Sequence, residues 1–320
     1  MLFFALNGSD RLGQQVARTG GFDIAQHEER EFDGGEHKAR PLVDVRGQDI
    51  FVLHSLNGDA HASANDKILR LLFFLAACRE HGAARVIAIA PYLAYSRKDR
   101  QTKLYDPVTT RYVAQLFEAT GVAMVVTLDV HNLAAFQNAF RCRTLHLATD
   151  RLFATHIAAQ DSTLPPAIVS PDPGGVKRAQ LVREALEEVT GRSVPFGLME
   201  KRRSAGVVSG THFAGDVEGC AVYIVDDMIC GGGTILRAAE AVRAGGAAEV
   251  HAIATHDLLR DAAVSAFSQT TLVNTITVTD SVAALEATRE RLGDRLRILT
   301  CAPPIADAIK RFHHPLDGSQ

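Results

Sequence analysis

Short hydrophobic runs alternate along the chain with longer stretches in which hydrophobic residues recur every three or four positions. The runs are rich in Val, Ile and Ala, as in buried strands, and the longer stretches have the spacing of amphipathic helices. This alternation is typical of parallel sheets covered by helices, so the predicted fold class is α/β. Strands are expected at residues 1–6, 50–53, 86–90, 123–128, 167–169, 221–225, 250–254 and 272–278, and helices at residues 65–80, 108–119, 175–187 and 232–244.

One segment occurs twice in similar form. GAARVIAIAP occupies residues 82–91 and GAAEVHAIAT occupies residues 246–255, and each follows a stretch that contains Ile-Leu-Arg. A duplicated domain would leave such a pair, although Ala-rich segments also match by chance. No linker of low complexity separates the halves. We therefore predict two domains, residues 1–145 and 146–320.

Composition restricts the class of protein. The 320 residues suffice for two domains, and the hydrophobic fraction of 47% with a charged fraction of 22% is typical of globular chains. A net charge of -3 offers no basic excess for nucleic acid or an anionic membrane. No apolar run is long enough to span a bilayer. Five cysteines without CxxC spacing argue against a disulfide framework or a zinc site and favour the cytoplasm.

The strongest chemical signal is VDDMICGGGT at residues 225–234, between a predicted strand and a predicted helix. Three successive glycines let backbone N–H groups converge on an anion at a helix N-terminus, and Thr234 can add a hydroxyl donor. The carboxylates of Asp226 and Asp227 can accept hydrogen bonds from a sugar diol. Ribose 5-phosphate has both features. A glycine-rich turn with an exposed acidic pair is the alternative.

Two further segments carry carboxylates at predicted strand ends. Asp172 lies in SPDPGGVKRA at residues 170–179, where the glycines allow close approach to a ligand but also suit a plain strand-to-helix turn. Asp129 and His131 end the strand at residues 123–128 and should point the same way, because side chains two apart share a face. Magnesium with nucleotide phosphates suits this pair, and a local hydrogen bond is the alternative.

Two basic segments complete the candidates. EKRR at residues 200–203 is either a solvated charge cluster or part of a mobile arm that brings cations to a transferring phosphoryl group. PYLAYSRKDR at residues 91–100 combines aromatic rings with cations. That combination suits a nucleotide or a subunit contact.

In this order, the segments resemble those of the ribose-phosphate pyrophosphokinase, or phosphoribosyl pyrophosphate (PRPP) synthetase, family. The resemblance begins at FDGGE (residues 32–36) and ends at APPIADAI (residues 302–309). It implies two tandem phosphoribosyltransferase-like domains, each a mostly parallel sheet flanked by helices, in a homo-oligomer between dimer and hexamer. It also implies transfer of the diphosphoryl group of MgATP to the C1 hydroxyl of ribose 5-phosphate, giving PRPP and AMP.

The resemblance assigns roles to single residues. Lys201 and Arg203 would be catalytic cations of a flexible arm in the second domain, and Asp129 and His131 would bind magnesium. The first domain would make the oligomer contacts and bind ATP through Phe32, Glu36, Arg97, Asp99 and Arg100. The second would bind ribose 5-phosphate through Asp172, Asp226, Asp227, Cys230, Gly231, Gly232, Gly233 and Thr234.

The chain also departs from the family pattern, at Gly34, Lys98, Arg141, Cys230 and Gly231. These changes leave the nucleotide preference and the second metal open. One alternative is a regulatory paralogue that has lost turnover. The other is a phosphoribosyltransferase that consumes PRPP, although the two-domain length, DVH and EKRR argue against it.

Overall fold

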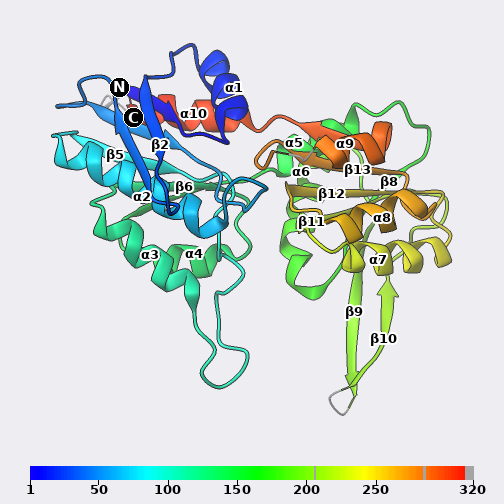
Figure 1. The fold of residues 1–320 in the computed structure, drawn as a ribbon. Coiled ribbons are helices and arrows are strands. Elements are labelled where there is room, and N and C mark those ends of the chain that lie inside the picture. Colours follow the sequence, from blue (N-terminus) through cyan, green and yellow to red (C-terminus); the bar gives the residue numbers. More distant parts are fainter. Residues whose placement is uncertain (205–206, 284–285, 314–320) are drawn as a thin grey trace. The chain divides into compact units, whose positions relative to one another are not determined.

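The computed structural model describes residues 1–204, 207–283 and 286–313, with side chains outside residues 201–211. The chain forms two compact units (Figure 1). The first consists of Met1–Leu147, Ser281–Ala283 and Thr300–Gln320, and the second of Ala148–Asp280 and Ala284–Leu299. Within the described ranges, no helix combines the length and the hydrophobicity needed to cross a membrane.

The first unit is built on a five-stranded parallel sheet with the order β1-β4-β5-β6-β7. Its inner strands read as nearly continuous hydrophobic runs, because both faces of the sheet are covered. Beside it, β2 (His27–Glu31) and β3 (His37–Pro41) form an antiparallel hairpin. The sheet strands are β1 (Leu2–Ala5), β4 (Asp49–Leu53), β5 (Arg85–Ile89), β6 (Met124–Leu128) and β7 (Arg143–Leu147).

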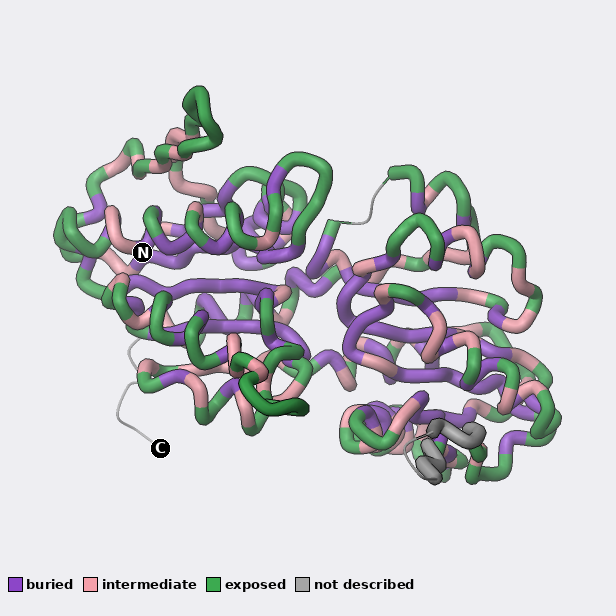
Figure 2. The backbone as a smooth tube through the Cα atoms, turned by 60° about the horizontal axis from the view of Figure 1, so that its bottom comes forward, coloured by how far each residue is buried: buried purple, intermediate pink, exposed green. Residues whose placement is uncertain are grey.

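Helices cover both faces of this sheet. One core cluster holds buried residues of α2, α3 and α4, and another holds those of α1 and α10. Figure 2 shows the buried strands between the more exposed helices. The helices are α1 (Asp10–Gly20), α2 (Ala64–Glu80), α3 (Thr109–Ala119), α4 (Leu133–Ala139) and α10 (Ala302–His313).

The second unit contains a seven-stranded sheet with the order β10-β9-β8-β11-β12-β13-β14. All neighbours are parallel except β9 and β10, which form an antiparallel hairpin. The strands are β8 (Pro166–Ser170), β9 (Phe196–Ser204), β10 (Val207–Ala214), β11 (Ala221–Ile229), β12 (Glu249–Asp257), β13 (Thr275–Thr279) and β14 (Leu296–Leu299).

Helices also cover both faces of the second sheet. Buried residues of α7, α8 and α9 join one core cluster, and those of α5 and α6 join another. The helices are α5 (Asp150–Ala158), α6 (Val176–Thr190), α7 (Gly233–Ala244), α8 (Asp261–Gln269) and α9 (Glu286–Leu292), with short 3₁₀ turns η1 (Pro173–Gly175) and η2 (Gly293–Arg295).

The two halves of the chain repeat one order of elements. Each runs strand, helix, hairpin, strand, helix, strand, helix, strand, helix, strand and final helix, apart from the 3₁₀ turns of the second half. The two similar sequence segments include β5 and β12, which occupy equivalent places in this order. This equivalence supports duplication over a chance match.

The final helix of each half packs in the other unit. Helix α5 follows β7, yet its Ile157 shares a core cluster with Leu186 of α6. Helix α10 follows β14, yet its Ile305 shares a cluster with Val16 of α1. The domain predicted at residues 146–320 therefore loses its last helix to the first unit, because the apolar face of α10 is buried against α1.

Candidate functional site

The glycine-rich segment connects β11 with the amino end of α7. Gly232 caps the helix with a left-handed backbone, φ 72°. The first four N–H groups of a helix have no partner within the helix, and its amino end carries a partial positive charge. No acidic side chain lies in the first turn of α7 to take up these groups. The loop therefore has the geometry of an anion site.

Neighbouring elements hold this loop in its conformation. The backbone N–H groups of Leu258 and Arg260 donate to the carbonyl oxygens of Ile229 and Cys230, at 3.0 and 3.2 Å. A Cβ on Gly232 would lie 2.7 Å from Cε2 of Phe267 on α8. The connection from β12 to α8 was not among the sequence candidates, because its contacts with the loop are long-range.

The equivalent position in the first unit is closed by its own carboxylates. Asp66 in the first turn of α2 accepts hydrogen bonds from the Ser63 backbone at 2.8 Å and from its hydroxyl at 2.7 Å. Asp59 accepts from the backbone N–H groups of His61 and Ala62, at 2.8 and 2.9 Å. These carboxylates occupy donors that an incoming anion would need, so the loop of the second unit is the better anion site.

The acidic pair lies within β11, just before the loop. Asp227 is buried, and Arg178 of α6 lies 3.9 Å from its carboxylate. Burial and the neighbouring Asp227 raise the pKa of the half-buried Asp226 to about 8. The pair therefore holds a proton near neutral pH, and it can donate as well as accept a hydrogen bond.

Asp172 lies at the carboxyl end of β8, the strand beside β11. Its Oδ1 accepts hydrogen bonds from the backbone N–H groups of Gly174 and Gly175, at 2.9 and 3.1 Å. The hydroxyl of Ser170 donates to the Asp172 carbonyl at 2.7 Å. One role of Asp172 is thus to cap its own turn.

The predicted arm is the hairpin of β9 and β10, which projects from the second unit in Figure 1. Lys201 pairs with Thr211 and Arg203 with Val208 in the backbone register. The side chains of Lys201 and Arg203 lie outside the described residues, so their roles stay predictions.

In the first unit, one hydrogen bond joins two of the predicted segments. The side-chain amide of Asn132 donates to Asp99 Oδ2 at 2.6 Å. This contact links the segment that contains Arg97, Asp99 and Arg100 with the turn that contains Asp129 and His131. The turn follows β6, whose neighbours are β5 and β7.

Asp129 has an unusual backbone conformation at this turn. It is buried, its φ is 33°, and its N–H donates to the carbonyl of Leu147 at 3.0 Å. A positive φ is strained for a residue other than glycine, and such strain often occurs at functional sites. His131, two residues on, is exposed. Among the described residues, no three His, Cys, Asp or Glu side chains come together as a metal site.

Phe32 and Glu36 flank the tip of the β2–β3 hairpin. The Phe32 N–H donates to the Glu36 carbonyl at 2.8 Å, and the Phe32 side chain is 42% exposed. Gly34 and Gly35 have φ values of 90° and 85°, which disfavour other residues. Gly34 is one of the positions at which the chain departs from the family pattern, and this backbone conformation explains why a glycine is favoured there.

The middle of the same hairpin holds a buried carboxylate that the sequence did not single out. Glu29 Oε1 and Oε2 lie 3.0 and 3.1 Å from Nε2 of His27 and His37, and Glu29 also accepts from the Asn7 N–H at 2.6 Å. Although burial opposes ionisation, the hydrogen bonds from His27 and from the Asn7 N–H hold the pKa of Glu29 below its ordinary value. Glu29 thereby fixes the hairpin to the sheet.

Arg141 is another position at which the chain departs from the family pattern. Its guanidinium donates to the carbonyl of Asn138 at 3.0 Å.

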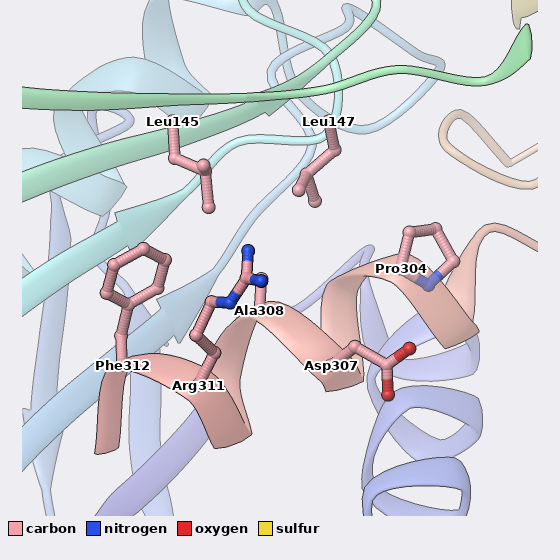
Figure 3. Close-up of a pocket in the computed structure, with 7 residues that line it drawn as sticks. All are labelled: Leu145, Leu147, Pro304, Asp307, Ala308, Arg311 and Phe312. Atoms are coloured by element: carbon pink, nitrogen blue, oxygen red, sulfur yellow. The ribbon is translucent and has the colours of Figure 1, made fainter. Parts of the chain in front are cut away.

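A cavity of about 280 Å³ lies between β7 and α10 in the first unit (Figure 3). Its lining is mostly apolar and includes none of the predicted site residues. The lining residues are Leu145, Leu147, Pro304, Asp307, Ala308, Arg311 and Phe312.

Two α/β units with one order of elements, and an acidic pair before a glycine-rich anion loop, define a tandem phosphoribosyltransferase-like protein. Family models agree: the N-terminal domain of ribose phosphate pyrophosphokinase matches residues 1–121 and the phosphoribosyl transferase domain matches residues 143–286. The ribose-phosphate pyrophosphokinase of Caldanaerobacter subterraneus subsp. tengcongensis is 32% identical, over 99% of this chain and 96% of its own. The chain belongs to the ribose-phosphate pyrophosphokinase family.

Further comparisons agree over nearly the whole length. The ribose-phosphate pyrophosphokinase of Granulibacter bethesdensis is 34% identical, over 98% of this chain and 96% of its own. The crystal structure of phosphoribosylpyrophosphate synthetase from Mycobacterium smegmatis superposes with a TM-score of 0.87 at 29% identity, covering 97% of this chain and 98% of that one. The predicted fold class, family and enzyme class are thereby confirmed.

Proposed function

We propose that this chain makes PRPP and AMP from MgATP and ribose 5-phosphate. The observation that supports the substrate most directly is the anion loop at residues 230–234 beside the acidic pair on β11. The loop N–H groups and the Thr234 hydroxyl would bind the 5-phosphate. Asp226 and Asp227 would bind the sugar hydroxyls, with Asp172 on the neighbouring strand.

The turn after β6 suits a magnesium ion that arrives with a nucleotide. Mg²⁺ in proteins is usually held by one or two carboxylates together with substrate phosphates and water. The Asp129 carboxylate fits such a partial set, and the His131 imidazole would add a nitrogen ligand beside it. When bound, the ion would neutralise charge that develops on the phosphate oxygens. Arg97, Asp99 and Arg100 would orient the nucleotide.

The reaction joins the C1 hydroxyl oxygen of the sugar to the β-phosphorus of ATP and breaks the bond between that phosphorus and the α,β-bridging oxygen. AMP leaves with that oxygen, and the hydroxyl proton passes to solvent or a base. Such a transfer requires positioning and charge stabilisation more than covalent help. Lys201 and Arg203 would provide cations at the developing negative charge.

A homo-oligomer is part of this proposal. Helix α2 exposes Leu69 and Phe73, and helix α3 exposes Tyr112 and Leu116, each pair one turn apart. Exposed apolar pairs on neighbouring turns are typical of contact surfaces. The exposed hairpin tip with Phe32 and Glu36 would then reach the adenine in the site of a neighbouring subunit.

The direct test measures AMP and PRPP after incubation with ATP, Mg²⁺ and ribose 5-phosphate, each omitted in turn. We expect both products in equal amounts only when all three are present. Ribose 5-phosphate binding without AMP formation would instead support the regulatory paralogue. Release of pyrophosphate from PRPP and a nucleobase would support the phosphoribosyltransferase.

The Lys201→Ala variant tests the arm. We expect kcat to fall by about a hundredfold or more with little change in ribose 5-phosphate affinity, because a cation on an arm acts mainly on the transition state. Lys310→Ala, at an exposed position of α10, is the control. A kcat equal to that of the parent would remove Lys201 from the proposed mechanism.

A further inference from the structure

Arg237 of α7 folds back over the start of its own helix. Its Nη2 donates to the Thr234 hydroxyl oxygen at 3.4 Å. Its Nη1 lies 3.2 Å from the position that a Cβ on Gly233 would take. The guanidinium therefore covers the first turn of α7, at the loop already described as an anion site.

This is an unfavourable place for a cation. The amino end of a helix carries partial positive charge, which stabilises anions and repels cations. The first turn of α7 contains no acidic residue, and among the described residues no carboxylate forms an ion pair with Arg237. Arg243, in the last turn of the same helix, instead donates to the carbonyls of Ala247 and Ala248 at 3.2 and 2.7 Å, where a cation is favourable.

An anion in the loop would remove this repulsion. It would lie against the N–H groups of the loop and against the guanidinium at once, and hydrogen bonds between charged groups are stronger than neutral ones. The contact with Arg237 also constrains Thr234. Because the Thr234 oxygen accepts from Arg237, its hydroxyl proton remains available to donate to the same anion.

We propose that Arg237 is a phosphate-binding residue that selects for the 5-phosphate of the sugar and orients the Thr234 hydroxyl toward it. This inference rests on the proposed function of the loop. Arg237→Gln should raise the dissociation constant for ribose 5-phosphate by about tenfold or more, because a charge-assisted contact is lost. Arg237→Lys, which keeps the charge without the planar fork, should show an intermediate loss.

The experiment is calorimetric titration with ribose 5-phosphate, at low and high salt, of the parent, both Arg237 variants and Arg192→Gln. Arg192 is an exposed arginine after α6 and is the matched control. We expect the loss of affinity in Arg237→Gln to shrink at high salt, and Arg192→Gln to match the parent. In the assay, KM for ribose 5-phosphate should rise more than kcat falls.

Thermal unfolding without ligand separates binding from a structural role. Removing a cation from the positive end of α7 should leave the unfolding temperature of Arg237→Gln equal to or above that of the parent. If Arg237→Gln binds ribose 5-phosphate within twofold of the parent, the assignment of Arg237 is overturned while the proposed function stands. If the parent itself does not bind ribose 5-phosphate, both are overturned.

Discussion

At the scale of single residues, burial and neighbouring charge raise the pKa of carboxylic acids near the glycine-rich loop. Asp226 and Asp227 are adjacent in β11, yet burial and the neighbouring charge raise the pKa of Asp226. Asp257 at the end of β12 shows the same direction: burial raises its pKa. Its Oδ1 accepts from the Leu259 N–H, which fixes the connection that supports the glycine-rich loop. Burial thus raises the pKa of two acids near this loop.

Asp226 should make the protein less stable as pH rises. Its pKa is about 8 in the folded chain against 3.8 as the ordinary value, so between these pH values the folded state binds a proton that the unfolded state has lost. Stability therefore falls with rising pH across this window. Asp226→Asn removes the titrating group, and its unfolding temperature should exceed that of the parent by about 3 °C or more at pH 8.

Calorimetric unfolding at pH 5, 6.5 and 8 checks this, with Asp161→Asn as the control because Asp161 is exposed. Parallel curves for Asp226→Asn and the parent would show that Asp226 is charged in the folded state. Ribose 5-phosphate affinity should fall in Asp226→Asn, since an amide replaces a proposed ligand.

At the scale of elements, supporting contacts come from segments distant in the sequence. The glycine-rich loop between β11 and α7 lies against the β12–α8 connection and Phe267. The β2–β3 hairpin is held where Glu29 accepts a hydrogen bond from the backbone N–H of Asn7, which lies 22 residues earlier in the chain. The loop and the hairpin both carry residues that are proposed to bind a substrate. In both, other residues hold the backbone in place.

Gly232→Ala should disrupt the glycine-rich loop between β11 and α7. Its Cβ would lie 2.7 Å from the Phe267 ring, and the left-handed φ of 72° adds strain. Both effects displace the loop, so ribose 5-phosphate affinity should fall by at least about tenfold, as about 1.4 kcal/mol of strain or more would produce. Gly231→Ala is the matched control, because a Cβ added to Gly231 would have no atom within 4 Å.

Calorimetric titration with ribose 5-phosphate compares the two alanine variants. A larger loss in Gly231→Ala than in Gly232→Ala would contradict the view that Phe267 and the left-handed cap shape the loop.

At the scale of the whole chain, one order of elements occurs twice but only one copy keeps an open anion loop. In the first unit, Asp59 and Asp66 accept from the donors around the start of α2. In the second, the first turn of α7 has no acid. The two copies have thus diverged in the loop while keeping the same succession of strands and helices, which is consistent with separate roles for ATP and ribose 5-phosphate.

Phe73→Glu should weaken the proposed homo-oligomer. Phe73 is 56% exposed on α2, one turn from the exposed Leu69, and a charge there would have to be desolvated on association. Light scattering after size exclusion should show a lower mass for Phe73→Glu than for the parent and for the control Gln14→Glu, at an exposed position of α1. An unchanged mass would exclude this part of α2 from the contact.

Local features of this protein follow from the sequence alone. Hydrophobic periodicity and glycine placement depend on neighbours in the chain. The strands predicted at 221–225 and 250–254 are confirmed within β11 and β12, and the predicted glycine-rich turn occupies residues 230–232, since α7 begins at Gly233. The same local segments, in order, identified the family. The roles of individual site residues stay predictions.

Features that depend on long-range contacts emerge only in the folded chain. The polar strands β2 and β3 carry no hydrophobic alternation, and Glu29 of β2 anchors them by accepting a hydrogen bond from the backbone N–H of Asn7, which follows β1. Helix α10 has an apolar face that any complementary surface could bury, and the fold buries it against α1. The pKa of Asp226 likewise follows from burial, which no local pattern specifies. In each case the deciding partner lies elsewhere in the fold, so pattern alone could not supply it.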